Sequence, residues 1–357
     1  MKKHANIPIF IPHEGCRNEC VFCNQRTITG TSMGSDRNIV PEIEKALSTI
    51  PDEYEIEIAF FGGSFTGIGK EKMTRLLDDA YKYIKDGKVQ SIRLSTRPDY
   101  IDEEILDILK SRGVTHIELG IQSMRQNVLD ACRRGHTATD TENACRLIND
   151  YGFILGGQMM IGLPCSTLED EVYTAKLIGE MGAKEARIYP CVVFHKTELC
   201  NMAMDGRYLP ISVEDAVTRS TRVYYELKRH NINILRIGLQ SSESLSGNDE
   251  VFGGAYHPAM GELVESRVKL EGILSAIEYY KSEQKFDCHG HVFTVECNKC
   301  DLSKVIGHKK SNLEIIRKAA IDAGFSDLNI KTNDKVKENS LMIHFGQPLE
   351  IQESGGN

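Results

Sequence analysis

The stretch Ile7-Pro-Ile-Phe-Ile-Pro-His-Glu-Gly-Cys16-Arg-Asn-Glu-Cys20-Val-Phe-Cys23 joins an apolar, strand-like run to a loop that carries three cysteines. Their spacing is C-x3-C-x2-C. Three thiolates on one short loop can hold three irons of a [4Fe–4S] cluster. The fourth iron then has no protein ligand and can bind a substrate or cofactor, whereas clusters that only carry electrons usually have four protein ligands. The loop is therefore predicted to be a reaction centre.

Zinc is the alternative metal that these cysteines can bind. A zinc site needs four ligands, and His13 can supply the fourth. The chain has 11 cysteines in all. In a reducing compartment, clustered cysteines indicate metal binding more than disulfides.

The composition is that of an ordinary soluble protein, because 41% of the 357 residues are hydrophobic and 26% are charged. No apolar stretch reaches the about 20 residues that a membrane span needs, so we expect no membrane association. The first residues lead into a strand rather than a signal sequence, which predicts a cytoplasmic protein. The net charge of −8 argues against a generally basic nucleic-acid surface, although it leaves room for a local basic patch.

Strand and helix patterns alternate along most of the chain. Apolar, β-rich runs predict strands at residues 7–12, 55–61, 91–95, 115–119, 154–161, 186–193 and 231–237. Helix-period segments predict helices at residues 40–50, 70–85, 102–111, 139–151, 168–181 and 213–230. Asp102 and Asp140 are the expected N-caps of two of them.

Repeated β-then-α units imply parallel strands with right-handed crossovers. Six or seven such units predict an α/β fold of the partial (β/α)6 TIM-barrel type. The first strand then delivers the cysteine loop to the carboxyl end of the barrel, the face on which active sites of such barrels form.

The pattern changes after Leu239. Residues 262–281 and 312–323 have helical patterns, residues 291–296 predict a strand, and a polar strand pair follows. We therefore predict a barrel core over residues 1–240, a small α+β extension over 241–350 that is a candidate for RNA binding, and a disordered tail over 351–357.

Glycine and polar residues end several predicted strands, where glycine allows close backbone approach to a ligand. Any one of these ends is also compatible with a plain turn, but the feature recurs in successive units. The candidate residues at these ends are Gly62, Gly63, Ser64, Ser95, Thr96, Glu118, Gln122, Ile161, Gly162 and Leu163.

Taken together, these motifs resemble the radical S-adenosylmethionine (SAM) enzymes, and more closely the radical SAM module of the elongator catalytic-subunit family and its bacterial relatives. The resemblance covers about residues 5–270. It is carried by the cysteine loop and, in order along the chain, by residues 62–65, 95–100, 113–123, 134–137, 161–164 and 188–190. Family members of the eukaryotic type continue into an acetyltransferase domain. This chain ends too early for one, so the resemblance does not extend to group transfer from acetyl-CoA.

The resemblance implies that Cys16, Cys20 and Cys23 hold the cluster and that SAM chelates the open iron. One electron, from a flavodoxin- or ferredoxin-like donor, then cleaves SAM to a 5′-deoxyadenosyl radical that abstracts a substrate hydrogen. The implied SAM contacts run in chain order. The methionine end of SAM is expected to meet Gly62, Gly63 and Ser64. The carboxylate or ribose is expected near Ser95 or Thr96, with Arg97 as a further candidate, and the ribose hydroxyls near Glu118 and Gln122. The adenine is expected to pack near Ile161, Gly162 and Leu163.

Three further residues have open interpretations. Phe22 is placed either for adenine or as packing under the loop. Arg134, in the run from Arg133 to His136, binds either an anionic substrate or the SAM carboxylate, or belongs to a solvated basic turn. Tyr189 is a radical relay or hydrogen-bond donor, or is simply half-buried.

The C-terminal part contains a second cysteine set, Cys288, Cys297 and Cys300, which predicts either a zinc or cluster site or an ordinary turn at a strand end. Further on, residues 305–312 resemble the G-x-x-G loop of KH-type RNA-binding folds, with Lys310 in place of the second glycine. The pair Lys309-Lys310 before a helix suits a phosphate, and an exposed basic turn is the alternative.

Three functions follow from these observations. The first is a radical SAM enzyme that modifies RNA, most plausibly tRNA. The second is a radical SAM enzyme acting on a small metabolite, in the manner of coproporphyrinogen oxidase. The third is an iron–sulfur module that binds RNA or senses redox state.

Overall fold

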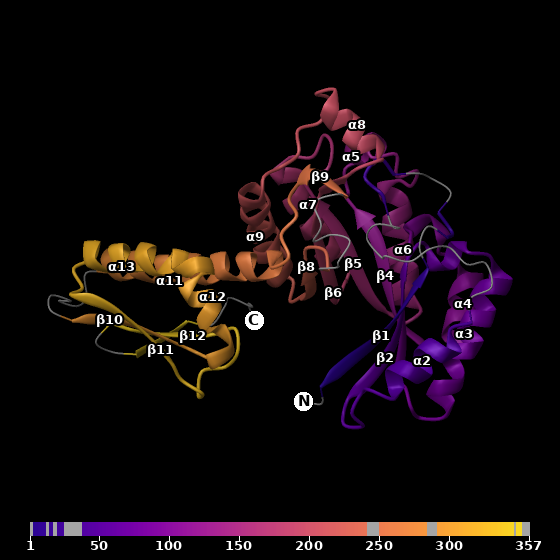
Figure 1. Ribbon diagram of the computed structural model, residues 1–357, viewed down its shortest axis with the longest axis horizontal. Coiled ribbons are helices and arrows are strands. Elements are labelled where there is room, and N and C mark those ends of the chain that lie inside the picture. Colours follow the sequence, from indigo (N-terminus) through magenta and orange to yellow (C-terminus); the bar gives the residue numbers. More distant parts are fainter. Residues whose placement is uncertain are drawn as a thin grey trace. The chain divides into compact units, whose positions relative to one another are not determined.

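The computed structural model describes residues 3–11, 14–16, 20–24, 38–240, 250–283, 291–345 and 348–351. It divides into two compact units (Figure 1). The first comprises Met1–Ala216 and His230–Pro258, and the second comprises Val217–Arg229 and Ala259–Asn357. No helix in these described ranges is long and apolar enough to cross a membrane.

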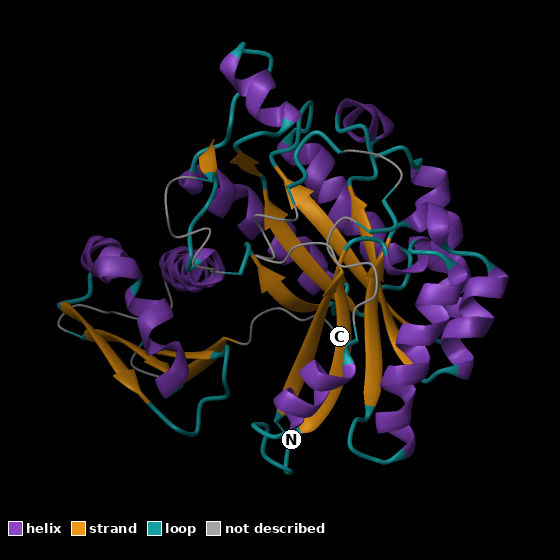
Figure 2. Ribbon diagram, turned by 45° about the vertical axis from the view of Figure 1, so that its right-hand side comes forward, coloured by secondary structure: helices purple, strands orange, loops and turns teal. Residues whose placement is uncertain are grey.

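The first unit is built on one parallel sheet of seven strands, in the order β1-β2-β3-β4-β5-β6-β8. The strands are β1 (His4–Ile11), β2 (Glu55–Gly62), β3 (Ser91–Thr96), β4 (Val114–Gln122), β5 (Ile154–Ile161), β6 (Glu185–Pro190) and β8 (Asn233–Ile237). The sheet curls but stays open, since β1 and β8 are its two edges among the described strands (Figure 2). The predicted partial barrel is therefore confirmed.

Helices follow the strands and cover the outer, convex face of the sheet (Figure 2). The helices of this part are α2 (Val40–Leu47), α3 (Lys70–Lys85), α4 (Glu103–Ser111), α5 (Gln126–Ala131), α6 (Ala138–Asp150), α7 (Leu168–Glu180) and α8 (Glu198–Met204), and α9 (Val213–Arg229) begins in this unit and ends in the second. Short 3-10 turns, η1 (Phe65–Gly67) and η2 (Pro98–Tyr100), follow β2 and β3. The Asp102 side chain accepts a hydrogen bond from the backbone N–H of Ile105, which confirms it as an N-cap.

The strands have two chemically different faces because side chains alternate along a strand. On β1, Ile7 and Ile9 are fully buried under the helices, whereas Asn6, Pro8 and Phe10 line the concave side. This alternation leaves an apolar core outside the half barrel and a polar interior inside it.

The second unit packs helices against a sheet of order β11-β10-β12-β13. Its elements are α11 (Met260–Glu283), β10 (Val292–Cys297), η3 (Lys299–Asp301), α12 (Leu302–Ile306), η4 (His308–Lys310), α13 (Ser311–Asp322), β11 (Asp327–Thr332), β12 (Leu341–His344) and β13 (Pro348–Ile351). Strands β10 and β11 are parallel and are joined through α12 and α13. The disordered tail was predicted to begin at residue 351, but Ile351 is the last residue of β13, and residues 352–357 lie outside the described residues.

Three further expectations need correction. The run 186–193 is two strands, because the chain leaves the sheet at Cys191 and continues as β7 (Val192–Phe194). Asp140 is not an N-cap, since Thr137 has that position and Asp140 closes the capping box from the third residue of the helix. The unit boundary also lies beyond residue 240, because β9 (Val251–Gly254) pairs with β7 and so belongs to the first unit.

Candidate active site

A cavity of about 580 Å³ lies on the concave side of the half barrel, entirely within the first unit. Its volume is in the range of about 300–1,000 Å³ that is usual for small-molecule sites. Most of the sequence-predicted site residues line it, and these are Cys16, Phe22, Cys23, Gly62, Gly63, Ser64, Ser95, Thr96, Glu118, Gln122 and Arg134. The structure therefore brings these residues together at one cavity.

The cysteine loop is tied to the protein on two sides. The Val21 N–H donates to the Cys132 carbonyl at 3.2 Å, and the Leu199 N–H donates to the Val21 carbonyl at 2.8 Å. Cys16 is exposed, and its Sγ lies 3.3 Å from the Ser64 hydroxyl. Cys20 is half-buried and accepts a hydrogen bond from Arg134 Nη1 at 3.3 Å. Cys16 and Cys23 therefore line the cavity, and two backbone hydrogen bonds hold the described part of the loop at Val21.

The close packing of the cysteine loop against the end of β2 itself requires glycine at Gly63 and Gly15. A Cβ on Gly63 would lie 2.1 Å from the Glu14 carbonyl oxygen, and one on Gly15 would lie 2.2 Å from the Ser64 carbonyl oxygen. Real Cβ atoms do not approach backbone so closely. The glycine run thus allows the end of β2 and the start of the cysteine loop to pack against each other.

Several buried polar groups around the cavity have no hydrogen-bond partner among the residues that the structure describes. The Oε1 atom of Gln122 and the Nη1 atom of Arg97 are both in this state, although Arg97 also forms two bonds to Asp99, at 2.9 and 3.0 Å. A buried polar group without a partner is costly, which indicates a place for a ligand. Among the described residues, the half-buried Ser95 hydroxyl also has no hydrogen-bond partner.

Thr96 differs from Ser95 because its hydroxyl proton is already donated to the Thr66 hydroxyl. The Thr66 hydroxyl donates to the Tyr100 carbonyl at 2.9 Å, so in its 2.6 Å contact with Thr96 it must accept. Thr96 can therefore only accept a hydrogen bond from a ligand.

The turn from Arg133 to His136 is only partly the solvated turn considered above. Arg133 is exposed, but Arg134 and His136 are 7% and 1% exposed. Arg134 Nη2 donates to the Gly120 carbonyl at 2.7 Å, which fixes the guanidinium beside Cys20. Burial, together with the nearby charge of Arg134, lowers the pKa of His136 to about 3, so this imidazole is neutral.

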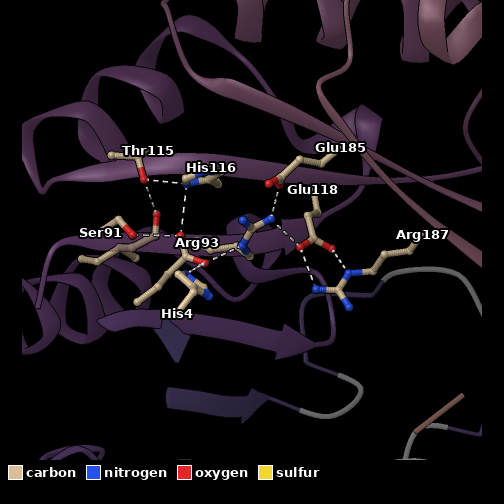
Figure 3. A network of polar contacts seen from close by, with 10 residues as sticks. His4, Ser91, Arg93, Thr115, His116, Glu118, Glu185 and Arg187 are labelled. Atoms are coloured by element: carbon tan, nitrogen blue, oxygen red, sulfur yellow. Dashed lines mark hydrogen bonds and ion pairs between the residues drawn. The ribbon is translucent and has the colours of Figure 1, made fainter. Parts of the chain in front are cut away.

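Glu118 lines the cavity, but arginines occupy its carboxylate (Figure 3). Arg93 donates to its Oε1 at 2.9 Å, and Arg187 donates to Oε2 at 2.7 Å and to Oε1 at 3.1 Å. Arg93 also reaches the carboxylates of Glu57 and Glu185, at 2.7 and 2.6 Å. Glu118 is therefore part of a buried ion-pair network that crosses the half barrel, and this reduces its capacity to bond a ribose.

Ile161, Gly162 and Leu163, which were expected near adenine, are not among the residues that line the cavity. Ile161 is fully buried, and Leu163 packs with Val21 in a separate apolar cluster. The Gly162 N–H donates to Glu171 at 2.7 Å, and a Cβ there would meet Ile211 at 2.4 Å. This turn supports the cavity from behind.

Other residues of the cavity were not predicted. They lie inside strands rather than at strand ends, and they include Asn6, Phe10, Phe61, Gln158, Arg187 and Arg236. The available signal was a polar residue at alternate positions of an otherwise apolar strand. Tyr189, for which two interpretations were open, also lines the cavity.

The C-terminal cysteines are not gathered around a metal in the described part of the chain. Cys297 is fully buried in β10, whereas Cys300 is exposed and bonds Asn298 at 2.7 Å. Cys288 lies outside the described residues, as does His13. No three His, Cys, Asp or Glu residues of the described ranges stand close enough to hold one metal ion. Cluster thiolates each bind a different iron, so this finding bears on a zinc site and not on a cubane cluster.

Comparison with known proteins gives the family. Residues 10–178 match the model of the radical SAM superfamily, and residues 183–270 match that of the radical SAM C-terminal domain. The tRNA uridine(34) acetyltransferase of Methanocaldococcus infernus is 33% identical over 152 residues, which are 41% of this chain and 28% of that protein. The heme chaperone HemW of Bacillus subtilis is 24% identical over 253 residues, or 67% of this chain and 66% of that protein.

The structure of Methanocaldococcus infernus Elp3 with an N-terminal deletion has the same fold, with a TM-score of 0.60 and 24% identity. The match covers 76% of this chain and 64% of that one. The chain thus spans about a quarter to two thirds of the length of these relatives. Proteins of the matched superfamily use a [4Fe–4S] cluster and SAM. Since the two family models together match well over half of its residues, the chain belongs to the radical SAM superfamily of enzymes.

Proposed function

We propose that the chain holds a [4Fe–4S] cluster through Cys16, Cys20 and Cys23, binds SAM in the cavity of the half barrel, and modifies RNA, with tRNA as the RNA class. One observation carries the cofactor part. The cysteine loop places Cys16 and Cys23 in the lining of a cavity where, among the described residues, Gln122 Oε1 and Arg97 Nη1 are buried without hydrogen-bond partners.

The residues present fit these cofactors chemically. Thiolates are the ligands of iron–sulfur clusters, and two arginines, Arg97 and Arg134, lie beside Cys20 to balance the negative charge of such a cluster. The SAM carboxylate suits the free Nη1 of Arg97, and the free acceptor of Gln122 suits a ribose hydroxyl. Phe22 adds an aromatic surface at the same wall.

When bound, the two cofactors supply one-electron cleavage of the SAM sulfonium and removal of a hydrogen atom from the substrate. The chain's own residues bind and orient the cofactors and shield them from solvent. The Gly63 contact with Glu14 fixes the loop against β2, and Arg134 fixes Cys20. His136 stays neutral beside these arginines, which avoids adding a third positive charge there.

Two features support RNA as the substrate. The first is the similarity to tRNA uridine(34) acetyltransferase. The second is the loop between α12 and α13, where Lys309 and Lys310 are exposed and hold positive φ angles of 51° and 65°. Residues with such φ angles turn the chain sharply, so the two ammonium groups stand on a projecting turn where backbone phosphates can reach them.

The test is incubation of anaerobically reconstituted protein with SAM, reductant and total tRNA, followed by mass spectrometry of the digested nucleosides. The proposal predicts a new nucleoside mass that requires SAM. In a gel shift, Lys309→Glu and Lys310→Glu should each lower the slope of log affinity against log salt by about 1, whereas the exposed control Lys176→Glu should not. Unchanged nucleosides together with a salt-independent gel shift would reject RNA as substrate.

A small tetrapyrrole is the second candidate substrate, and the long match to HemW favours it. Heme titration separates the two candidates. If the substrate is a tetrapyrrole, we expect heme to bind saturably and total tRNA not to displace it.

A further inference from the structure

One wall of the cavity is left unused by the proposed cofactor contacts. We call it the second wall, and it consists of Asn6, Phe10, Phe61, Gln158, Tyr189 and Arg236. These residues come from both edges and from the middle of the sheet, and the curl of the half barrel brings them to one cavity.

Tyr189 can act as a donor toward the cavity. Tyr189 is half-buried and lines the cavity, and within the described residues its hydroxyl donates to no protein group. The hydroxyl proton is therefore available for another group. Burial raises the pKa of Tyr189, which keeps that proton in place at neutral pH.

Arg236 of the second wall and the cavity-lining Arg187 have different surroundings. Arg187 is committed, because it donates twice to Glu118 and stacks 5.2 Å from the centre of the Phe61 ring. Arg236 is half-buried and, within the described ranges, has no carboxylate partner. Glu118 is the one described carboxylate that lines the cavity, and Arg93 and Arg187 already neutralise it. Among the described residues no carboxylate pairs with Arg236, so its guanidinium favours an anionic group of a ligand.

The rest of the second wall suits a planar ring. The Phe10 and Phe61 rings lie 6.3 Å apart at an angle of 42°, and both face the cavity. Asn6 and Gln158 place amide groups, which both donate and accept, at the same wall. Aromatic faces with amides nearby are the means by which proteins hold an unstacked base, and arginine contacts its phosphate.

We propose that the second wall is the subsite for a single nucleotide of the RNA substrate, with the phosphate held by Arg236 and the Tyr189 hydroxyl and the base held against Phe10 and Phe61. An enzyme that acts on a base must take it out of its stack, and a cavity inside a half barrel requires this. The proposal rests on the function proposed above and assigns its substrate contacts.

The experiment measures nucleotide binding by isothermal titration calorimetry to the full-length reconstituted protein, with saturating S-adenosylhomocysteine present to fill the cofactor side. The probes are uridine 5′-monophosphate and uridine. The wild type should bind the monophosphate more tightly than the nucleoside. Arg236→Gln should weaken the monophosphate about tenfold or more and leave uridine unchanged, because it removes a charge-assisted contact to phosphate alone.

Tyr189→Phe keeps the ring and should weaken the monophosphate by about threefold to tenfold. Phe61→Ala should weaken both probes equally. Arg207→Gln is the matched control, since Arg207 is exposed and pairs with Asp205 at 2.7 Å away from the cavity. Thermal unfolding of each variant checks that it is folded.

Equal wild-type affinity for the two probes, no binding of the monophosphate while S-adenosylhomocysteine is saturating, or full binding by Arg236→Gln would each overturn the subsite. Binding of coproporphyrin that depends on Arg236, without binding of the monophosphate, would instead make this wall a carboxylate site for the small-molecule candidate. Nucleotide binding needs no turnover, so its failure is distinct from a failure to modify tRNA.

Discussion

Replacing Arg93 with Met should destabilise the first unit strongly. Arg93 is 4% exposed and donates to three carboxylates, those of Glu57, Glu118 and Glu185 (Figure 3). Methionine has a similar length but no charge. The change leaves three carboxylates close together inside the half barrel, two of them almost fully buried.

Two estimates give the size of the effect. Removing one partner of a buried ion pair costs about 3–5 kcal/mol. Burial alone raises the pKa of Glu57, but the hydrogen bond from His116 and the charge of Arg93 outweigh it and bring this pKa from 4.5 to about 2. At about 1.4 kcal/mol per pH unit, that depression is worth about 3 kcal/mol, part of which Arg93 supplies. We therefore expect Arg93→Met to lower the free energy of unfolding by about 3 kcal/mol at pH 7.

The loss should also depend on pH in a defined direction. In the wild type, the pKa of Glu57 is lower in the folded than in the unfolded state. Its stabilisation is therefore complete above about pH 4.5 and is lost as the pH falls toward about 2. In the variant, the crowded carboxylates have raised pKa values and take up protons on folding, so stability increases as the pH falls from 7 to 5. The difference in free energy of unfolding between the wild type and Arg93→Met should therefore become smaller from pH 7 to pH 5.

Urea unfolding followed by circular dichroism at pH 7 and pH 5 measures both effects. The control is Arg112→Met, which breaks a more exposed pair with Asp78 and should cost at most about 1 kcal/mol, with no narrowing at pH 5. A loss below about 1 kcal/mol for Arg93→Met, or a gap that is the same at both pH values, would refute the assignment of Arg93 as the charge that holds these carboxylates together.

The remaining predictions concern the loop, a cap and the second cysteine set. Gly63→Ala puts a Cβ 2.1 Å from a backbone oxygen of the cysteine loop and should lower the iron content after reconstitution by half or more, whereas Gly253→Ala, where a Cβ meets nothing within 4 Å, should leave it unchanged. Replacing Asp102 with Ala should cost about 1 kcal/mol in urea unfolding, because it removes the cap of α4, and no loss would contradict that role. Serine at both Cys297 and Cys300 should leave iron and zinc content unchanged by metal analysis, and loss of a separate metal would reveal a second site.

Periodicity was enough to predict the sheet. The strand over 154–161 and the helix over 70–85 have the predicted bounds, because long segments with a consistent apolar pattern have little alternative. The break at Cys191 was missed although Pro190 stands directly before it. Proline cannot donate a hydrogen bond within a sheet, so Pro190 was the local signal that the strand ends there.

The site was predicted where the sequence has a recognisable local pattern. Glycine and hydroxyl residues at the ends of β2 and β3 have such a pattern, so Gly63 and Ser95 were found. Gln158 and Arg236 were missed because a polar residue within a strand faces either solvent or a cavity, and only the curl of the sheet decides which. Ile161 was misplaced for the converse reason, since its position at a strand end did not show that it points to the outer core.

Formation of 5′-deoxyadenosine tests most directly the claim that the cysteine loop and the cavity form one reaction centre. The wild-type protein, reconstituted anaerobically with iron and sulfide, is incubated with SAM and dithionite beside Cys20→Ala, and the products are measured by mass spectrometry. The account predicts equal amounts of 5′-deoxyadenosine and methionine from the wild type, and none from a variant that has also lost the absorption near 400 nm. Absence of 5′-deoxyadenosine from wild-type protein with a full cluster, or its formation by Cys20→Ala, would contradict the account.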